Sequence, residues 1–472
     1  MSSLGVNANP VLMKKITKLP GSFRDPSGFI FQKDSSVYRQ VNTSYKSDYD
    51  KLMTTGLYKS LVDSDLLIAH KESSMKAPEP DMAYKIIKPE LIPFISYPYE
   101  WSFSQLKAAA LTTLDISLRA LEHDMILKDA TAFNIQFVNN KPILIDTLSF
   151  QEYENNKPWV AYKQFCQHFL APLALMSYGD IRTLQLMRTN IDGIPLDLAS
   201  TLLPKKSWLN LGIATHVHLH AKSQKKFADK HQTIKSSSRG ISKTQLINIL
   251  TNLRSTIEGL DWKVAKTEWG DYYKETNYTD KAFTHKQTLV KDIAKKIKPK
   301  QIWDLGANTG EFSITAAPYT KNVVALDIDP LAVERNFQSL NKIKIDNILP
   351  LIQDLTNPSP ALGWHNKERM SLIERGPVDL VLALALIHHL AISNNLPLAS
   401  IANFLHKITT NLVIEFVPKP DSQVQKMLIS REDIFDKYTQ VQFEKEFGKY
   451  FTTKAKHKIT GSKRTLYWLK AK

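Results

Sequence analysis

The sequence predicts an α/β protein in which a doubly wound parallel sheet forms the C-terminal half and an α+β part precedes it. Residues 301–311 run from an apolar strand through a turn with two glycines into a helix, which is the first unit of a doubly wound sheet. Two further buried-strand patterns follow, and they end in carboxylates at Asp327 and Asp354. With 43% hydrophobic residues, the chain has enough apolar side chains for cores of this kind.

The composition narrows the class of protein. A chain of 472 residues accommodates two or three domains. It carries 62 Lys and Arg against 46 Asp and Glu, a formal net charge of +16. Such a balance suits nucleic acid or another anionic partner. Because the charge is spread along the chain, a Lys-rich surface is the favoured interpretation.

Cysteine use and hydropathy indicate the compartment. The single cysteine, Cys166, excludes disulfides within the monomer and fits a reducing environment. The first residues lack the charged and apolar regions of a secretory signal, and the longest apolar run, 380–387, is too short to span a bilayer. We therefore expect a cytoplasmic protein with no membrane partner.

Shifts in composition divide the chain into four predicted segments. They are a leader at 1–20, an α+β domain at 21–221, a basic linker at 222–243 and the doubly wound domain at 244–472.

The α+β domain begins with alternating aromatic and β-branched residues around a polar turn, which predict a hairpin over 25–41. Ser102 is a plausible N-cap for a long helix that continues towards His123. Two short strands around residues 138–141 then lead to Asp146.

Three polar residues in this region form a candidate site. Asp129 is followed five positions later by Asn134, and Asp146 comes after the short hairpin. In this order they resemble the catalytic core of protein kinases and aminoglycoside phosphotransferases. The resemblance implies that Asp129 positions a hydroxyl, that Asn134 and Asp146 bind Mg²⁺, and that ATP is the second ligand.

The chain departs from that family pattern at several positions. Leu127 stands where a His is usual, and Leu148 replaces the Gly of the metal-binding triplet. Neither a glycine-rich phosphate loop nor a typical Lys-bearing strand is present, and Arg39 matches the lysine only by position. We favour a kinase-like fold kept for substrate binding; the alternative is a simple hairpin whose carboxylates cap turns.

A histidine trio closes this half. His216, His218 and His220 alternate, which would place them on one face of a strand. Imidazoles bind metals, but no carboxylate or cysteine lies nearby in the sequence, so we expect no metal site.

In the C-terminal half, polar residues recur where predicted strands end. Asp304 and its glycine turn follow the first strand, Asp327 the second and Asp354 the third. The fourth strand runs into the pair His388–His389. Ligands of doubly wound sheets lie at these strand ends, so the residues are expected to share one site.

The motif Asp-x-Gly-x-x-x-Gly at 304–310 differs from the dinucleotide pattern Gly-x-Gly-x-x-Gly. With the later strand ends, it resembles class I S-adenosylmethionine-dependent methyltransferases over roughly residues 245–472. The resemblance implies a Rossmann-like seven-stranded domain with an antiparallel hairpin at its end. The whole arrangement is also similar to bacterial two-part methyltransferases related to host-specificity nodulation proteins.

The resemblance assigns roles to individual residues. Asp304, Gly306, Asn308 and Gly310 would hold the methionine moiety of S-adenosylmethionine. Asp327 would bind the ribose and Asp354 the edge of the adenine.

Residues near the transferred methyl group complete the candidate site. His388 or His389 would act as a base if the acceptor loses a proton; the alternative is a wall or hydrogen-bonding role. Tyr273, in an aromatic segment, would face the sulfonium in a cation–π contact. Glu415 on the fifth strand is either functional or, more simply, a paired strand-end acid.

The predicted function is an S-adenosylmethionine-dependent methyltransferase with a kinase-like N-terminal domain. The alternatives are a bifunctional protein whose N-terminal domain is an ATP- and Mg²⁺-dependent phosphotransferase, and a non-catalytic S-adenosylmethionine-binding protein. The sequence does not identify the methyl acceptor or the oligomeric state.

Overall fold

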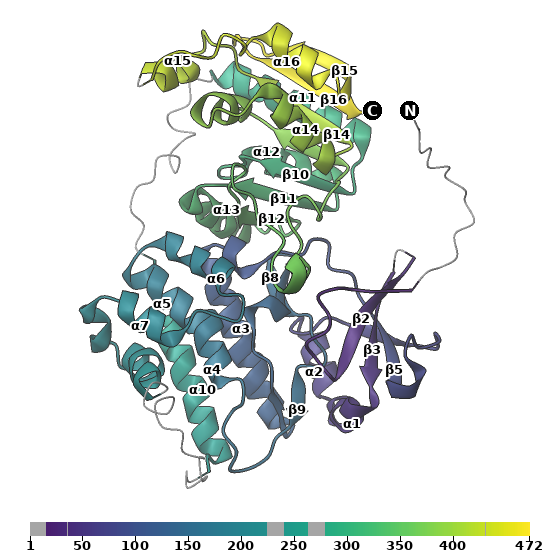
Figure 1. The fold of residues 1–472 in the computed structure, drawn as a ribbon, viewed down its shortest axis with the longest axis vertical. Helices are drawn as coiled ribbons and strands as arrows, with labels where there is room; N and C mark the ends of the chain where they lie inside the picture. Colours follow the sequence, from purple (N-terminus) through teal and green to yellow (C-terminus); the bar gives the residue numbers. More distant parts are fainter. Residues whose placement is uncertain (1–15, 35, 224–239, 263–278, 430) are drawn as a thin grey trace.

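The computed structural model describes residues 16–34, 36–223, 240–262, 279–429 and 431–472. Two sheet-containing halves are stacked along the long axis of the molecule, the N-terminal half below and the C-terminal half above in Figure 1. The prediction of an α/β protein is confirmed. None of the described helices is both long and apolar enough to cross a membrane.

The N-terminal half opens with a five-stranded antiparallel sheet in the order β1-β2-β3-β5-β4. Its strands are β1 (Thr17–Lys18), β2 (Gly28–Lys33), β3 (Ser36–Asn42), β4 (His70–Ser73) and β5 (Ala83–Pro89). The predicted hairpin is β2–β3. Part of the predicted leader belongs to this sheet, because β1 pairs with β2.

Helices and two short two-stranded sheets form the rest of this half. Ser102 caps α3 (Phe103–Glu122) as predicted, in a capping box with Gln105. The two pairs are β6 (Met125–Leu127) with β9 (Phe150–Glu152), and the hairpin of β7 (Ile135–Val138) with β8 (Lys141–Leu144), which lies between them in the chain. The other described α-helices of this half are α1 (Lys46–Thr54), α2 (Leu57–Asp63), α4 (Tyr162–Phe165), α5 (Ala171–Tyr178), α6 (Leu186–Thr189), α7 (Leu196–Leu202), α8 (Leu211–Ile213) and α10 (Lys243–Glu258).

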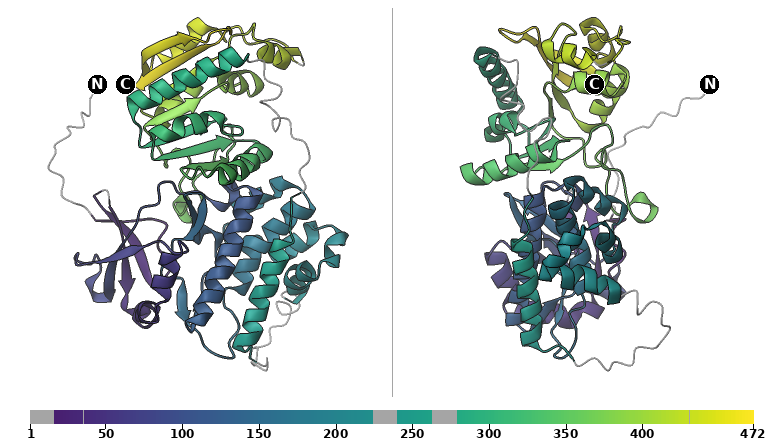
Figure 2. Two further views of the ribbon diagram at one scale, coloured as in Figure 1. Left: turned by 180° about the vertical axis from the view of Figure 1, so that it is seen from behind. Right: turned by 90° about the vertical axis from the view of Figure 1, so that its left-hand side faces the viewer.

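Two expectations for this region are wrong. The predicted domain limit at 244 made α10 the start of the C-terminal domain, but α10 packs beside α3 (Figure 2). Its apolar face, with Leu246, Leu250 and Leu253, is buried in the core of the N-terminal half. The histidine trio lies in a helical segment rather than a strand, since residues 214–219 form a turn of π-helix.

The C-terminal half is a seven-stranded sheet in the order β12-β11-β10-β13-β14-β16-β15. Its strands are β10 (Gln301–Leu305), β11 (Asn322–Asp327), β12 (Ile348–Ile352), β13 (Leu380–Ala383), β14 (Asn411–Phe416), β15 (Phe451–Lys458) and β16 (Thr465–Ala471). The first five strands of this half, β10 to β14, are parallel, and β16 is antiparallel to both neighbours. Its helices are α11 (Asp280–Ile297), α12 (Glu311–Ala316), α13 (Pro330–Ile343), α14 (Leu398–Ile408), α15 (Ser422–Ile429) and α16 (Gln440–Phe447).

Successive residues of these strands face opposite sides of the sheet, and the two faces are covered differently. On one side α11 and α12 bury Ile302, Val323 and Leu380. On the other side the core is continuous with that of the N-terminal half, where Phe94 meets Trp303 edge to face at 5.7 Å. The two halves therefore share one hydrophobic core.

The crossover from β12 to β13, residues 353–379, contains one turn of 3-10 helix at Trp364–Asn366 and no α-helix. Parallel strands are usually joined through an α-helix that covers the sheet. Here the N-terminal half covers part of that face, and the crossover extends down to it (Figure 1).

Candidate functional site

The glycine turn after β10 has the backbone geometry that the motif predicts. Gly306 and Gly310 have φ angles of 71° and 86°, in the left-handed region that favours glycine. A Cβ on Gly310 would lie 2.6 Å from Nδ2 of the buried Asn336. The turn is held to β11 because Gly306 N and Ala307 N both donate to Leu326 O, at 2.8 and 3.0 Å.

A cavity of about 330 Å³ opens at the carboxyl ends of the parallel strands. That volume lies within the range for small-molecule and cofactor sites, about 300–1,000 Å³. Six of the predicted residues line it: Asp304, Gly306, Asn308, Asp327, Asp354 and His389. Gly310 shapes the turn behind the cavity and is not in its wall.

Asp304 stands near the end of the first strand, β10, and is almost fully buried. Its Oδ2 accepts a hydrogen bond from Ser313 Oγ of α12 at 2.7 Å. Burial raises the pKa of Asp304 to about 6. The carboxylate is therefore ready to ionise near neutral pH when a cationic ligand approaches.

Asp327 ends the second strand, and the backbone fixes both of its oxygens. Oδ2 accepts from Asn308 N and Oδ1 from Asp329 N, each at 2.8 Å. Burial raises the pKa of Asp327 to about 6 as well. A carboxylate has about four acceptor positions, so these two bonds leave it able to accept from a ligand.

Asp354 follows the third strand and lines the cavity. Its Oδ1 accepts from both the amide and the hydroxyl of Thr356, at 2.8 and 2.6 Å. These bonds fix the turn that leads out of β12, and both residues line the cavity.

The structure separates the two candidate histidines. His389 lines the cavity, whereas His388 is 1% exposed and absent from the cavity wall. Burial lowers the pKa of His389 to about 4 and that of His388 further below its ordinary value. Both imidazoles are neutral at pH 7. Tyr273 falls outside the residues that the structure describes.

The sequence analysis missed Lys286, which lines the cavity from α11. Its Nζ forms a buried ion pair with Glu415 Oε2 at 2.6 Å, and Ala385 N donates to the same oxygen at 2.8 Å. Glu415 is thus a paired acid, the simpler of the two interpretations offered. A signal for Lys286 existed, because it interrupts the buried stripe formed by Ala282 and Val290 on α11.

Asp129, Asn134 and Asp146 of the N-terminal half also lie in one region. Their hydrogen-bond and ion-pair partners include other protein side chains. Asp129 Oδ1 accepts from Gln164 Nε2 at 2.8 Å. Burial and the neighbouring Asp146 raise the pKa of Asp129. Asn134 Nδ2 donates to Ser149 Oγ at 3.2 Å.

Arg39 on β3 occupies the centre of this second cluster. Its NH1 contacts Asp146 Oδ1, and its NH2 donates to Asp25 Oδ2 at 3.0 Å. Asp146 therefore already has a protein cation as its partner. Among the described residues, no group of three or more His, Cys, Asp or Glu is arranged to hold a metal ion.

A protein of known sequence is similar to almost the whole chain, and solved structures resemble part of its fold. No family model matches the sequence. The nodulation protein NoeA of Rhizobium meliloti (strain 1021) is 36% identical over 457 residues, which span 95% of each chain. The N-methyltransferase NodS from Bradyrhizobium japonicum WM9 is 13% identical, covers 41% of this chain and 97% of its own, and has a TM-score of 0.31.

A second solved structure, the magnesium protoporphyrin IX methyltransferase from Synechocystis PCC 6803 with bound S-adenosylhomocysteine, is 15% identical. It covers 43% of this chain and 93% of its own, with a TM-score of 0.31.

Proposed function

We propose that this chain, which belongs to the family of the nodulation protein NoeA, is an S-adenosylmethionine-dependent methyltransferase. The observation that carries the proposal is the convergence of Asp304, Asp327 and Asp354 on one cavity. They come from three neighbouring strands, and the glycine turn lies beside them.

The chemistry of the wall suits this cofactor. S-adenosylmethionine carries two positive groups, the sulfonium and the ammonium, against one carboxylate. Among the described residues of the wall there are three carboxylates and one ammonium, that of Lys286. Asp327 would accept from the ribose hydroxyls and Asp354 from the adenine amino group, while Asp304, Gly306 and Asn308 would hold the methionine end. The antiparallel hairpin β15–β16 agrees with the class I resemblance.

A dinucleotide is the main competitor, and the same wall disfavours it. A pyrophosphate needs backbone amides and positive charge at the glycine turn. Here Asp304 and Asp327 flank the turn, and their ionised forms would repel phosphate oxygens.

When bound, the cofactor supplies an activated methyl group. The chain has to align an acceptor with that group and exclude water. His389 is the candidate for contacting the acceptor. Its pKa of about 4 makes it a weak base, so we propose that it orients the acceptor through a hydrogen bond rather than removing a proton.

Calorimetric titration of the full chain with S-adenosylhomocysteine tests the proposal. We expect the wild type to bind and Asp327→Asn to lose about 10–100-fold in affinity, because charge-assisted hydrogen bonds contribute about 1.5–3 kcal/mol. The matched control is Asp379→Asn. Asp379 also accepts two backbone amides, from Lys300 and Gln301, but at the opposite end of the sheet.

Absence of binding by the wild type would refute the proposal, as would equal affinities in the Asp327 and Asp379 variants. Transfer of a labelled methyl group to a component of a bacterial extract then separates an enzyme from a protein that only binds the cofactor.

For the N-terminal half we propose a binding role, in preference to phosphotransfer. The observation in favour is the contact of Arg39 with Asp146, the residue that the kinase resemblance assigns to Mg²⁺. A carboxylate neutralised by a guanidinium is a poor ligand for a divalent cation.

A further inference from the structure

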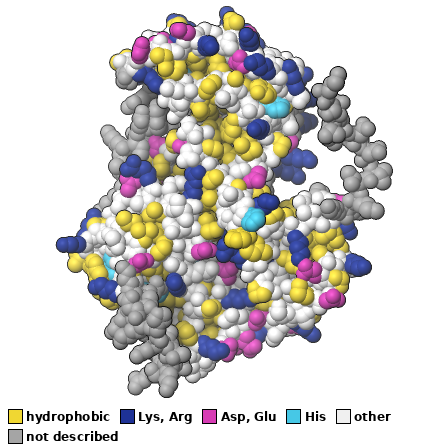
Figure 3. Space-filling model, viewed as in Figure 1, with side chains coloured by type: hydrophobic (Ala, Val, Ile, Leu, Met, Phe, Trp, Pro, Cys, Tyr) yellow, Lys and Arg dark blue, Asp and Glu magenta, His cyan; other side chains and the backbone are white. Residues whose placement is uncertain are grey.

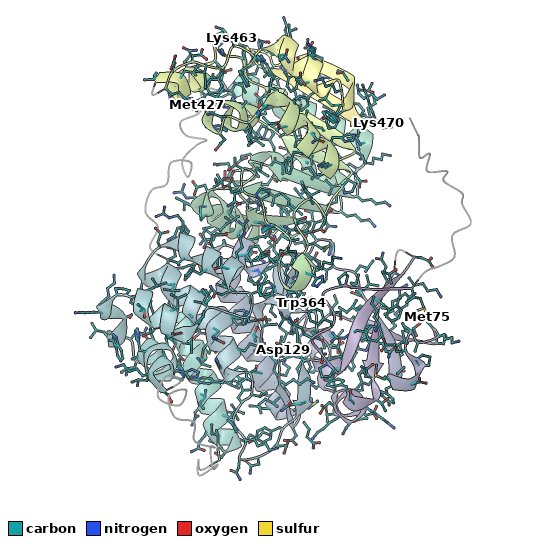
Figure 4. All side chains as sticks on the ribbon, viewed as in Figure 1. Met75, Asp129, Trp364, Met427, Lys463 and Lys470 are labelled. Carbon is teal, nitrogen blue, oxygen red and sulfur yellow. The ribbon has the colours of Figure 1, made fainter. Side chains whose placement is uncertain are left out.

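The crossover between β12 and β13 connects the cavity to the N-terminal half. It begins in the cavity wall with Gln353 and Asp354 and then leaves the sheet. Arg188 NH2 donates to Asn357 Oδ1 at 3.2 Å, and Arg24 binds Glu368 through two hydrogen bonds of 2.8 Å. Figure 4 labels Trp364 on this crossover and Asp129 in the half that it reaches.

A buried polar chain joins residues near both ends of the crossover to Glu100 of the N-terminal half. Arg375 binds Glu100 with both terminal guanidinium nitrogens, at 2.9 and 2.6 Å. Ser359 Oγ lies 2.5 Å from Glu100 Oε1 and 3.0 Å from Gln353 Oε1. The four residues belong to two halves of the protein, and Glu100, Ser359 and Gln353 are 2%, 5% and 5% exposed.

Gln353 braces the nucleoside end of the cavity. Its backbone N donates to Asp327 O at 2.7 Å, and its side-chain Nε2 donates to Asp354 O at 3.1 Å. It therefore connects the residue proposed for the ribose with the residue proposed for the adenine. The position of its side chain depends on Ser359, whose hydroxyl group has one hydrogen for two acceptors.

We propose that Glu100, in the N-terminal half, is a positioning residue for the adenine end of the cavity and acts through Ser359 and Gln353. This inference rests on the proposed function. Glu100 is held in place from both sides, since Tyr97 N donates to its Oε2 at 2.9 Å and Arg375 neutralises its charge. Glu100 thereby fixes the position of the Ser359 oxygen, which lies 3.0 Å from Gln353 Oε1 and limits where the Gln353 side chain can lie. The cofactor site is thus incomplete without the N-terminal half.

The test compares two ligands that differ only in the base. S-adenosylhomocysteine carries an adenine amino group, which Asp354 can accept from. S-inosylhomocysteine carries an oxygen there, which repels a carboxylate. We expect the wild type to prefer the adenine ligand and Ser359→Ala to reduce that preference about tenfold. General loosening of the fold would weaken both ligands equally and leave the preference unchanged.

The matched control is Ser104→Ala, which removes a hydroxyl from the same interface. Ser104 Oγ donates to Glu334 on α13, away from the cavity wall. The base preference of this variant should equal that of the wild type. Glu100→Gln, with folding checked by thermal unfolding, is the second variant and should shift the preference in the same direction as Ser359→Ala.

The binding measurements separate the positioning role of Glu100 from the proposed cofactor binding on which it rests. If the wild type binds neither ligand, the proposed function fails and the inference falls with it. If the wild type binds with a base preference that Ser359→Ala and Glu100→Gln leave unchanged, the positioning role alone is refuted.

Discussion

The two halves of the molecule each gather carboxylates near the ends of strands, but they neutralise them differently. In the C-terminal half, Asp327 takes hydrogen bonds from uncharged amides and faces a cavity. In the N-terminal half, Asp146 contacts the guanidinium of Arg39. Because the Arg39 guanidinium already balances its charge, Asp146 is less available to a cationic ligand than Asp327 is.

The largest expected effect comes from breaking the glycine turn. In Gly310→Ala, a left-handed residue gains a Cβ that meets Asn336 at 2.6 Å. We expect a loss of about 2–4 kcal/mol of stability from strain and overpacking, and about a 100-fold loss of affinity for S-adenosylhomocysteine. Chemical denaturation and calorimetric titration measure the two effects.

Gly56→Ala is the control for this substitution. Gly56 has a similar φ of 79°, but a Cβ there would meet nothing within 4 Å. It should cost about 1–2 kcal/mol of stability and leave the affinity unchanged. An equal loss of affinity in both variants would contradict the role given to the turn.

A smaller effect is expected from pH. Burial raises the pKa values of Asp304 and Asp327 to about 6, and the ammonium group and ribose hydroxyls of S-adenosylhomocysteine would favour their ionised forms. Affinity for S-adenosylhomocysteine should therefore rise between pH 5 and 7, about tenfold for each carboxylate that has to ionise, and level off above. His389, with a pKa of about 4, stays neutral over this range and adds nothing.

The same raised pKa values give the stability of the ligand-free protein the opposite dependence on pH. The folded state holds the protons of Asp304 and Asp327 more tightly than the unfolded state, in which the pKa of Asp is 3.8. These protons therefore stabilise the fold at low pH. Their contribution to stability decreases as the pH rises from about 4 to 6. Calorimetry in buffers of different ionisation enthalpy counts the protons released on binding. A flat affinity between pH 5 and 7 would show that the carboxylates do not ionise on binding.

The smallest effect is expected in the N-terminal half. Asp146→Asn should change the affinity for S-adenosylhomocysteine less than twofold, and the wild type should transfer no phosphate from labelled ATP in the presence of Mg²⁺. Phosphate transfer that disappears in Asp146→Asn or Asp129→Asn would restore the phosphotransferase alternative.

The sequence was most informative where the signal is local. The cap at Ser102, the glycine turn and the strand ends at Asp327 and Asp354 follow from residues close together in the chain. The choice between His388 and His389 was not predictable, because it depends on the rotation of the π-helical turn at 389–393.

Features that join distant segments were beyond local patterns. The pairing of Arg39 with Asp146 and the link from Glu100 to Gln353 bring together residues more than a hundred positions apart. The limit of the N-terminal half was placed too early for a similar reason. An amphipathic helix such as α10 shows which face it buries, but not against which partner.

The net positive charge of the chain is not gathered in one place on the visible surface of the described residues. On the face shown in Figure 3, Lys and Arg side chains are interspersed with Asp and Glu. The mixture of the two signs on that face matches the even spread of charge along the sequence.

The edge-to-face contact of Phe94 with Trp303 has a consequence for the C-terminal half on its own. Without the N-terminal half, the buried Trp303 ring and the apolar side chains around it would be exposed to water. The N-terminal half therefore shields an apolar face of the sheet that carries the cavity.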